Sequence, residues 1–399
     1  MTGVSRPEEI RRHNIALLLE HVHRQGPLTR AELTVRLGLN RSTIGALVAE
    51  LCALGLLQET VPCRTERNER AGRPSHVVAP RPDGPYGIAV DLEVDRVTVA
   101  AVQVGGELLC RAVTRLSASR RSAPAVARTI ARAVERLIAD MPVAAWPVGV
   151  GVSIPGAVRA AEGIVEAAPN LGWWGVPFAP MLESLLPRGL AVALGNDADL
   201  GVLAEHLRGA ARDADDVVYV TGKFGVGGGI LIGGRPLHGV GGLGGEIGHT
   251  ILDPAGPACH CGGFGCVEGY IGEEALLRLA GRPGPPDVEA VAAVLADARS
   301  GDPAAAGAVS QVARSLGQVL ANLVNLLNPQ VIVLGGVLAD VLELAGDEVI
   351  AELDRQAMGA ARRMVEVRSS GLGGDSSLLG AAEVAVRFLL ADPAAFAAS

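Results

Sequence analysis

The stretch that decides the fold and chemistry of this chain is residues 241–272, GGLGGEIGHTILDPAGPACHCGGFGCVEGYIG. Three of the six cysteines in the chain, Cys259, Cys261 and Cys266, fall within eight residues here, and His249 lies just upstream. One imidazole and three thiolates make a complete tetrahedral shell for Zn²⁺. Unrelated buried cysteines are the alternative, because cysteine often packs as a small hydrophobic residue. The crowding next to a histidine and a glycine run favours a structural zinc site.

Glycines separate the predicted ligands at Gly262, Gly263 and Gly265. We expect all three to adopt positive φ angles, because glycine lacks a Cβ and the backbone must fold back on itself in a tight metal loop. The predicted zinc loop therefore spans residues 249–266.

Two carboxylates flank the metal ligands, Glu246 before His249 and Glu268 after Cys266. Four thiol or imidazole ligands already fill the zinc shell, so both glutamates remain available for another partner. Carboxylates on a stiff, glycine-rich loop are suited to accept paired hydrogen bonds from vicinal hydroxyls. The alternative is solvent-facing charge, which is where most glutamates lie.

The segments GGEIGH and CHCGGFGCVE resemble the signature of the ROK family, which comprises repressors, open reading frames and sugar kinases. The glutamate, the histidine and the cysteines agree together in type and spacing, and the resemblance extends over about residues 84–390. In that family the histidine is both a zinc ligand and a sugar contact, and the two glutamates hold sugar hydroxyls. The resemblance implies these roles for His249, Glu246 and Glu268.

Length and composition describe a soluble globular protein of two or three domains, with 399 residues, 49% hydrophobic and 3% aromatic. No apolar run reaches the length that spans a bilayer, and residues 1–12 are charged rather than signal-like. The other cysteines, Cys52, Cys63 and Cys110, are scattered, so no disulfide framework is expected. These features predict a cytoplasmic protein with no membrane partner.

Charge is distributed unevenly along the chain, whose formal net charge is −8. Residues 1–82 contain 12 Arg and 8 Glu but no Lys or Asp, which gives +4, and the remainder carries −12. A basic head on an acidic body indicates that only the head meets a polyanion such as DNA.

Three helices are predicted in the head. A capping box with Pro7 in its first turn, Ser5-Arg-Pro-Glu8, begins the first, and Ile10, Leu17, Leu18 and Val22 recur at helical spacing as far as Arg24. Thr29 opens a second capping box, for a short helix that Gly38 ends. Asn40 caps the third helix, which stops at Gly55.

This order predicts a winged helix-turn-helix domain over residues 1–82, with the third helix in the major groove. Arg41, Ser42 and Thr43 lie in its first turn and are suited to contact phosphates or base edges. Residues 56–60 and 75–79 read as the strands of the wing, and Arg73 between them is suited to a minor groove. A protein-binding module is the alternative, but ROK repressors carry a similar winged helix in this position.

The body, residues 83–399, is predicted to be an α/β domain with two lobes. Strands at 86–94, 96–104, 107–113 and 148–156 surround a helix at 123–139, and a second round begins near Asp216. That round contains two strands around a glycine loop, a helix at about 304–327 and a strand at 331–336. The resemblance implies the actin-like (ribonuclease H-like) architecture of ROK sugar-binding domains.

Asn196 and Asp197 follow a predicted strand and begin a helix. The pair is explained by a helix cap alone, but it also matches the N-D-A motif of the family, in which the Asp is the general base for the sugar hydroxyl and the Asn binds sugar. The resemblance places Asp197 near Glu246 and Glu268 across the cleft between the lobes. It also implies sugar contacts from Gly156, through its backbone, and from Asn170; the tryptophans of APNLGWW are core or dimer-packing residues.

Both phosphate-binding loops of the family's kinases are altered here. Where kinases present D-x-G-G-T-K, this chain reads Asp91-Leu-Glu-Val-Asp-Arg96. The new carboxylates would face triphosphate oxygens, each at a cost of about 1–4 kcal/mol, and the side chains would block the backbone amides. The second loop is Lys223-Phe-Gly-Val-Gly-Gly-Gly229 in place of G-T-G-x-G-G-G, and Lys223, the only lysine, is interpreted as structural.

The sequence therefore predicts a ROK-type transcriptional regulator, usually a repressor of carbohydrate metabolism genes, that binds zinc and a sugar or sugar phosphate. We expect no catalytic residues, with Asp197 a vestigial base. A homodimer or tetramer would bind a two-fold symmetric operator. A sugar kinase with a DNA-binding appendage is one alternative, and a DNA-binding protein that senses a protein partner is another.

Overall fold

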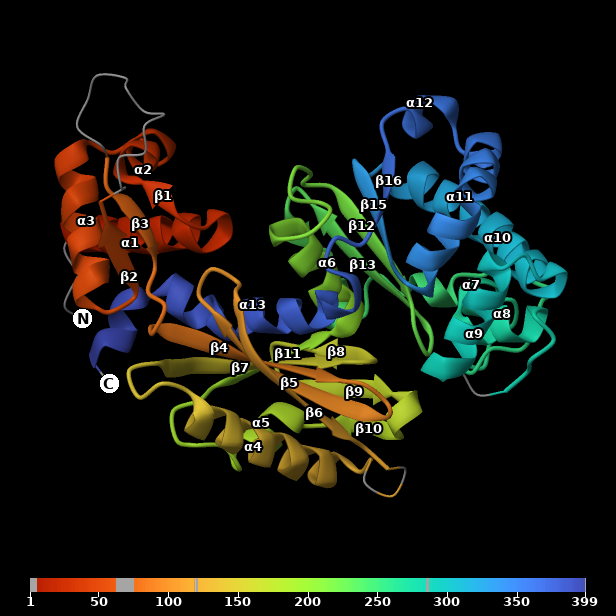
Figure 1. The fold of residues 1–399 in the computed structure, drawn as a ribbon, viewed down its shortest axis with the longest axis horizontal. Coiled ribbons are helices and arrows are strands. Elements are labelled where there is room, and N and C mark those ends of the chain that lie inside the picture. Colours follow the sequence, from red (N-terminus) through yellow and green to blue (C-terminus); the bar gives the residue numbers. More distant parts are fainter. Residues whose placement is uncertain (1–5, 62–74, 118, 120, 285–286, 399) are drawn as a thin grey trace. The chain divides into compact units, whose positions relative to one another are not determined.

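The computed structural model describes residues 6–61, 75–117, 119, 121–284 and 287–398 (Figure 1). The chain divides into a first unit, made of residues up to Gly195 and from Ala381 onward, and a second unit, Asn196–Gly380. Within the described ranges, none of the helices combines the length and apolar character that crossing a membrane requires.

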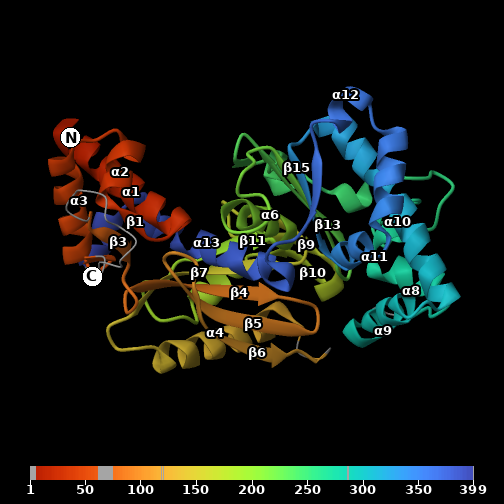
Figure 2. The same cartoon turned by 45° about the horizontal axis from the view of Figure 1, so that its top comes forward.

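The head is a winged helix, and it belongs to the first unit. Its elements are α1 (Arg6–Gln25), β1 (Leu28–Thr29), α2 (Arg30–Leu37), α3 (Arg41–Ala53), β2 (Leu57–Thr60) and β3 (Val77–Pro80). The strands form an antiparallel sheet in the order β1-β3-β2, beside the three helices (Figure 2). The predicted three helices and two-stranded wing are confirmed.

Local capping fixes the helices of the head. The Thr29 hydroxyl accepts a hydrogen bond from the backbone N–H of Glu32, and the Glu32 carboxylate accepts one from the backbone N–H of Thr29. Gly38 ends α2 in the left-handed conformation. Asn40 caps α3 through the N–H of Thr43. These predictions are confirmed, whereas the cap expected at Ser5 lies outside the described residues.

The apolar face of α1 differs in part from the prediction. Ile10 is 58% exposed, so its assignment to the stripe was wrong. The stripe begins at Ile15, so it is the second half of the helix that packs in the core of the head. The buried apolar residues of α1 are Ile15, Leu18, Leu19 and Val22.

The first lobe of the body is a five-stranded sheet in the order β11-β7-β4-β5-β6. Its elements are β4 (Pro85–Leu92), β5 (Arg96–Gln103), β6 (Leu108–Arg115), α4 (Ala123–Asp140), β7 (Trp146–Ile154), α5 (Phe178–Glu183) and β11 (Val192–Asn196). Helices α4 and α5 cover one face of the sheet. The final helix, α13 (Ser376–Ala391), packs closely on glycines of the other: a Cβ at Gly151 would lie 1.9 Å from the Ala381 carbonyl oxygen.

A small antiparallel sheet, which the sequence reading did not anticipate, follows β7. It contains β8 (Ala157–Arg159), β9 (Ile164–Ala168) and β10 (Trp173–Val176), with the 3-10 turn η2 (Pro169–Leu171) between the last two. Trp173 is buried against Phe178 and donates its indole N–H to the Arg121 carbonyl at 2.7 Å, whereas Trp174 is 67% exposed. Trp173 is therefore a core residue.

The second unit is built on a sheet in the order β14-β13-β12-β15-β16. Its strands are β12 (Val217–Gly222), β13 (Val226–Ile232), β14 (Arg235–Pro236), β15 (Val331–Gly336) and β16 (Glu366–Ser369). Its helices are α6 (Asp197–Leu207), α7 (Glu268–Ile271), α8 (Glu273–Leu279), α9 (Val288–Arg299), α10 (Pro303–Leu327), α11 (Val337–Gln356) and α12 (Gly359–Arg362).

Alternation along β12 explains why helices cover both faces of this sheet. Val217 and Tyr219 pack with α6, while Val218 and Val220 point the other way into a core formed with α10 and α11 (Figures 1 and 2). The predicted α/β body with two rounds of strands and helices is confirmed.

Candidate functional site

The predicted metal ligands come together in the second unit. The ligand atoms of His249, Cys259, Cys261 and Cys266 all lie within 4.8 Å of one another. Cys259 Sγ is 3.7 Å from His249 Nδ1, and Cys261 Sγ is 3.7 Å from Cys266 Sγ. Tetrahedral zinc with Zn–S bonds of about 2.3 Å requires ligand separations of about 3.6–3.8 Å. The two printed separations match this value, and the four side chains are grouped closely enough to hold a metal ion.

Backbone hydrogen bonds shape the loop around these ligands. Cys259 donates its N–H to the Gly263 carbonyl at 2.9 Å, and Gly262 donates to the Cys259 carbonyl at 3.0 Å. Gly262 and Gly265 have φ values of 93° and 67°, as predicted. Gly263 is not among the glycines of positive φ, so that expectation was wrong; in this tight turn its hydrogen bond to Cys259 needs only ordinary backbone geometry.

The two predicted sugar-binding glutamates lie beside the metal ligands. Glu246 precedes the short turn η4 (Ile247–His249), and burial raises its pKa, with Asp199 and Glu268 adding to the shift and His249 opposing it. Glu268 begins α7 and accepts a hydrogen bond from the Val226 N–H at 3.2 Å. Both carboxylates are therefore held at one edge of the second unit.

Asn196 and Asp197 lie at the start of α6. Asn196 Oδ1 accepts from the N–H groups of Ala198 and Asp199 at 2.8 and 3.1 Å, so the helix-cap interpretation is confirmed for its oxygen. Asp197 lines a small hollow of about 10 Å³ with Thr221 and Lys223. Lys223 therefore lies beside the predicted sugar site, a position that its sequence context did not indicate.

Asp197 was expected near Glu246 and Glu268 across the cleft between the lobes. The three residues do lie near one another, but the expected placement on two lobes was wrong, because all three belong to the second unit. They meet at the start of β13. A Cβ at Gly227 would lie 3.9 Å from Asp197 Oδ1, and one at Gly225 would lie 2.5 Å from Glu268 Oε2. The connection β11–α6 carries Asn196 and Asp197 into the same unit as the metal loop.

Gly156 and Asn170, the other predicted sugar contacts, belong to the first unit. Gly156 has a φ of 155°, and a Cβ there would lie 2.3 Å from the Ala167 carbonyl oxygen, so the fold itself requires glycine at this position. Asn170 is exposed in η2.

The altered first phosphate loop is the tight hairpin between β4 and β5. Glu93 forms a hydrogen-bonded ion pair with Arg96, and this hydrogen bond raises the pKa of Arg96 above its ordinary value. Val94 is buried. The side chains that replace the family's two glycines are thus packed into the hairpin.

Packing explains the glycine run that remains in the second loop. A Cβ at Gly228 would lie 2.4 Å from Ile247 Cδ1, and one at Gly229 would lie 2.3 Å from the Ala198 carbonyl oxygen. These glycines let β13 approach α6 and the turn that carries Glu246. The run therefore has a structural role that does not depend on a nucleotide.

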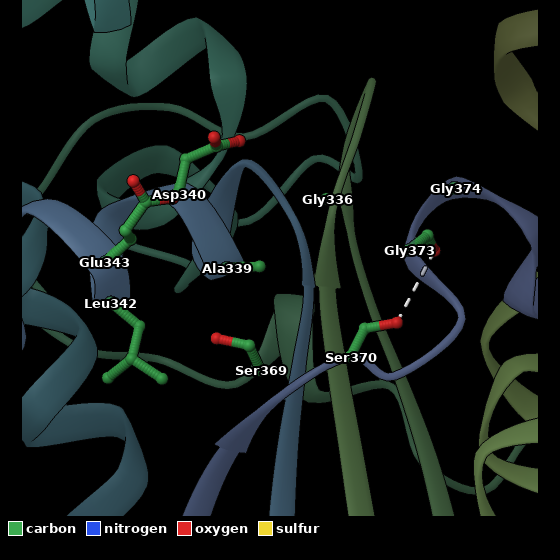
Figure 3. A pocket seen from close by; sticks show the side chains of 9 residues that line it. All are labelled: Gly336, Ala339, Asp340, Leu342, Glu343, Ser369, Ser370, Gly373 and Gly374. Atoms are coloured by element: carbon green, nitrogen blue, oxygen red, sulfur yellow. Dashed lines mark hydrogen bonds between the residues drawn. The ribbon is translucent and has the colours of Figure 1, made fainter. Parts of the chain in front are cut away.

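A larger hollow of about 490 Å³ lies at the end of β15 and β16 (Figure 3). Asp340 and Glu343 project from α11 on one side, and Ser370 with the Gly373-Gly374 turn forms the other. Both acidic groups lie within 3.5 Å of Arg299. The lining mixes apolar side chains, Ala339 and Leu342, with serines, glycines and the two acidic residues.

Sequence reasoning missed Asp199 and His238 near the site. Asp199 lies in the first turn of α6, and its Oδ2 is 3.9 Å from His238 Nδ1. This interaction raises the pKa of His238 above its ordinary value, against the opposing effect of burial. Asp199 directly follows the N-D-A motif in the sequence, and this position could have indicated a place near the site.

Of the predicted DNA-contacting residues, three are described. Arg41 and Ser42 are exposed at the start of α3 and Thr43 is half-buried. The Ser42 hydroxyl donates to Asn40 Oδ1 at 2.7 Å, so part of its hydrogen-bonding capacity serves the cap. Arg73 lies outside the described residues.

Comparison with known proteins identifies both parts of the chain. The ROK family model matches residues 87–387, and the MarR family model matches residues 16–73. The chain is 25% identical to the xylose repressor of Bacillus subtilis (strain 168), across 96% of this chain and 97% of that protein.

Two solved structures extend these similarities. One is a ROK family transcriptional regulator, a homologue of the E. coli MLC protein, with a TM-score of 0.76 and 25% identity across 96% of this chain and 97% of that one. The other is a ROK family glucokinase from Streptomyces griseus in complex with glucose and AMPPNP, with a TM-score of 0.66 and 30% identity across 75% and 98%.

These findings define a class of protein in which a MarR-type winged helix precedes an actin-like sugar-binding domain. The chain belongs to the ROK family.

Proposed function

We propose the following mechanism by which this chain acts as a sugar-responsive DNA-binding transcriptional repressor. A sugar binds to the second unit at Asn196, Asp197, Glu246, His249 and Glu268, and the resemblance to the family keeps Gly156 and Asn170 as further candidate sugar contacts. Binding favours one conformation of the body over another, and the affinity of the head for its operator changes. The sugar acts only through its differential affinity for the two conformations.

The observation that carries this proposal is that predicted sugar-binding residues lie beside a group of four side chains that could hold a metal ion. The same chain has a capped helix, α3, in the position of a recognition helix. The altered hairpin between Asp91 and Arg96 supports sensing without phosphoryl transfer. Its side chains fill the position where kinases of the family place glycines. We therefore propose that the chain is not an enzyme.

We propose structural Zn²⁺ as the resident metal, held by His249, Cys259, Cys261 and Cys266. Three thiolates and an imidazole suit zinc, and four protein ligands leave no open position for catalysis. The Nδ1 atom of His249 faces Cys259, so Nε2 is the ring nitrogen available to a sugar hydroxyl. The metal holds the segment between Glu246 and Glu268 in one conformation.

We propose that residues 1–82 bind DNA and that residues 83–399 bind sugar. Arg41, Ser42 and Thr43 contact the major groove at the start of α3, and Arg73 contacts the minor groove. Two copies of the chain bind a two-fold symmetric operator as a homodimer, because paired helix-turn-helix domains read half-sites about one helical turn apart.

The first sugar to test is D-xylose, because the similar protein of Bacillus subtilis is named for it. A duplex is selected by the zinc-loaded protein from a random-sequence pool, and its affinity is followed by fluorescence anisotropy. Xylose, glucose and their phosphates are then titrated without ATP. We expect one sugar to change operator affinity, and Glu246→Ala to shift that response to higher sugar concentration. Exposed Glu274 on α8 provides the matched control, Glu274→Ala.

Other outcomes point to other functions. Sugar-dependent ATP turnover would make the chain a kinase with a DNA-binding appendage, a role for which Asp91 and Asp197 are retained. Operator binding that no sugar alters, but that a protein partner relieves, would indicate a protein sensor. A failure to select any duplex at moderate salt would contradict DNA binding itself.

A further inference from the structure

Glu205 is a completely buried glutamate near the end of α6. Its Oε1 accepts hydrogen bonds from the hydroxyl groups of Ser370 and Ser376 and from the N–H of Leu372. The Ser376 bond is 2.8 Å long and the Leu372 bond is 3.2 Å long. These three donors come from residues 370–376, which we call the junction segment.

The second oxygen of Glu205 binds both the junction segment and its own helix end. Oε2 accepts from the N–H of Gly371 at 3.0 Å and from the N–H of Ala210 at 2.7 Å. A Cβ added at Gly371 would lie only 2.8 Å from the Ala210 nitrogen, and one at Gly209 would lie 2.0 Å from Glu205 Oε2. The two backbones therefore meet directly around this carboxylate, and buried polar groups with this many partners fix local geometry strongly.

Both ends of α6 lie beside the junction segment. Its first residue, Asp197, lines the small hollow together with Gly373, Gly374 and Ser376 of the junction segment. Glu205 lies eight residues later, about 12 Å along the helix axis at 1.5 Å per residue. A displacement of α6 by a ligand at its start must move the junction segment, because Glu205 attaches the other end to it.

The junction segment leads directly into α13, which begins at Ser376. The start of α13 packs on α6: a Cβ at Gly380 would lie 2.0 Å from the Leu200 carbonyl oxygen. From Ala381 onward the same helix belongs to the first unit. One continuous helix thus connects the segment that Glu205 holds to the unit that contains the winged helix.

The far part of α13 is built into the core of the winged helix. Val386 and Leu389 are buried in the cluster formed by α1 and α3. Glu383 Oε2 lies 2.7 Å from His23 Nε2 of α1, and both side chains are buried. Motion of α13 along its axis would therefore act on the helix that supports the recognition helix.

We propose that Glu205 is the positioning residue that transmits sugar binding from α6 through the junction segment and α13 to the DNA-binding head. This inference rests on the proposed function, since it assumes that sugar binds at the start of α6. Energetic coupling between distant sites requires an element with two arrangements, and the inference assigns that part to α13.

The test separates coupling from binding with Glu205→Gln. The amide replaces one accepting oxygen with a donor, so at least one pair of donors is left facing each other while the shape is kept. Three quantities are measured: the Kd for xylose or the sugar identified in the panel, the operator Kd without sugar, and the operator Kd at saturating sugar. Allosteric effects commonly change affinity by about 5–150-fold, and we expect the wild-type ratio in that range and the variant ratio below about 2-fold.

Sugar affinity of Glu205→Gln should stay within about 3-fold of the wild type, because the residue lies outside the proposed sugar contacts. The control Glu289→Gln changes an exposed glutamate of α9 and should keep the wild-type ratio. Ser376→Ala removes one donor only and should reduce the ratio partially; it decides the question if Glu205→Gln does not fold.

A wild-type ratio in the variants would overturn the inference, and so would loss of sugar binding in Glu205→Gln, which would make the residue part of the sugar site. A wild-type protein that binds sugar and operator without any change in operator Kd would overturn both this inference and the proposed function. A merely structural role would lower the melting temperature but leave the ratio, corrected for the active fraction, unchanged.

Discussion

The metal loop and the Glu205 junction both hold segments of the second unit in place, but they do so by opposite means. The metal loop gathers four ligands from 18 consecutive residues, 249–266. The junction gathers donors to Glu205 from residues as far as 171 positions away in the sequence. In the proposed function the first holds the groups that contact a sugar, and in the further inference the second connects those groups to the rest of the protein.

From this difference we expect sugar binding and operator response to be separable in this chain. Loss of the metal loop should remove both, because Glu246 and Glu268 depend on its conformation. Loss of the junction should remove the response alone. Variants that affect one region and not the other therefore test whether the two roles are separate.

The largest effect is expected from Cys259→Ser, which removes one of the four metal ligands. We expect about one zinc ion per wild-type chain and none in the variant. Changes outside the ligand shell already cost about 10–100-fold in metal affinity, so sugar affinity should fall by more than about 100-fold. Elemental analysis and calorimetry measure these quantities, with Cys110→Ser, at a half-buried cysteine of the first unit, as the control. A zinc-free variant that binds sugar with normal affinity would show that the metal loop is not needed for sugar binding.

A smaller effect is expected from Glu246→Ala. Hydrogen bonds to charged groups contribute about 1.5–3 kcal/mol, so sugar affinity should fall by about 10–150-fold. The operator response should nevertheless return in full at saturating sugar, because the junction is intact. Anisotropy titrations at increasing sugar concentration measure this. If operator affinity still did not change at saturating sugar, the metal loop and the Glu205 junction would not have the separate roles proposed for them.

Arg41→Ala lies outside both regions and should affect only DNA. Loss of one phosphate contact should weaken binding to all duplexes and reduce the salt dependence by about one ion per copy of the head. The ratio of operator Kd with and without sugar should not change. Arg24→Ala, which removes an exposed arginine of α1, is the matched control. Equal losses in the two variants would contradict the assignment of α3 as the recognition helix.

The smallest effect is expected from Asp199→Asn. The Asp199 side chain raises the pKa of His238 above its ordinary value of 6.5, so it stabilises the fold below that pH and loses its effect as pH rises through the elevated pKa. The variant should lower the pKa of His238 and flatten the pH dependence of the melting temperature slightly, because the His238 side chain is 58% exposed. NMR titration of the imidazole measures this, and an unchanged pKa would show that the contact is absent in solution.

Local signals made much of the fold predictable from the sequence. The capping groups of Thr29 and Asn40 depend on residues three positions away, and the alternation in β4 and β5 is a property of each strand alone. The metal cluster was predictable for the same reason, since its spacing lies within one loop. Ile10 was misplaced because helical periodicity does not show where along α1 the contact with α3 begins.

The rest depends on contacts that no local pattern records. Glu205 looks like any glutamate of an amphipathic helix, and only the tertiary fold places Ser370 and Ser376 around it. Asp197 was expected to oppose Glu246 across a cleft, because the sequence does not show that the chain passes into the second unit at Asn196.

The measurement that tests the central claim most directly compares operator affinity with and without saturating sugar in Glu246→Ala and Glu205→Gln. The account predicts that Glu246→Ala recovers the wild-type change at saturation, while Glu205→Gln binds the sugar and shows almost no change. Equal behaviour of the two variants, or a wild type whose operator affinity is indifferent to a bound sugar, would contradict it.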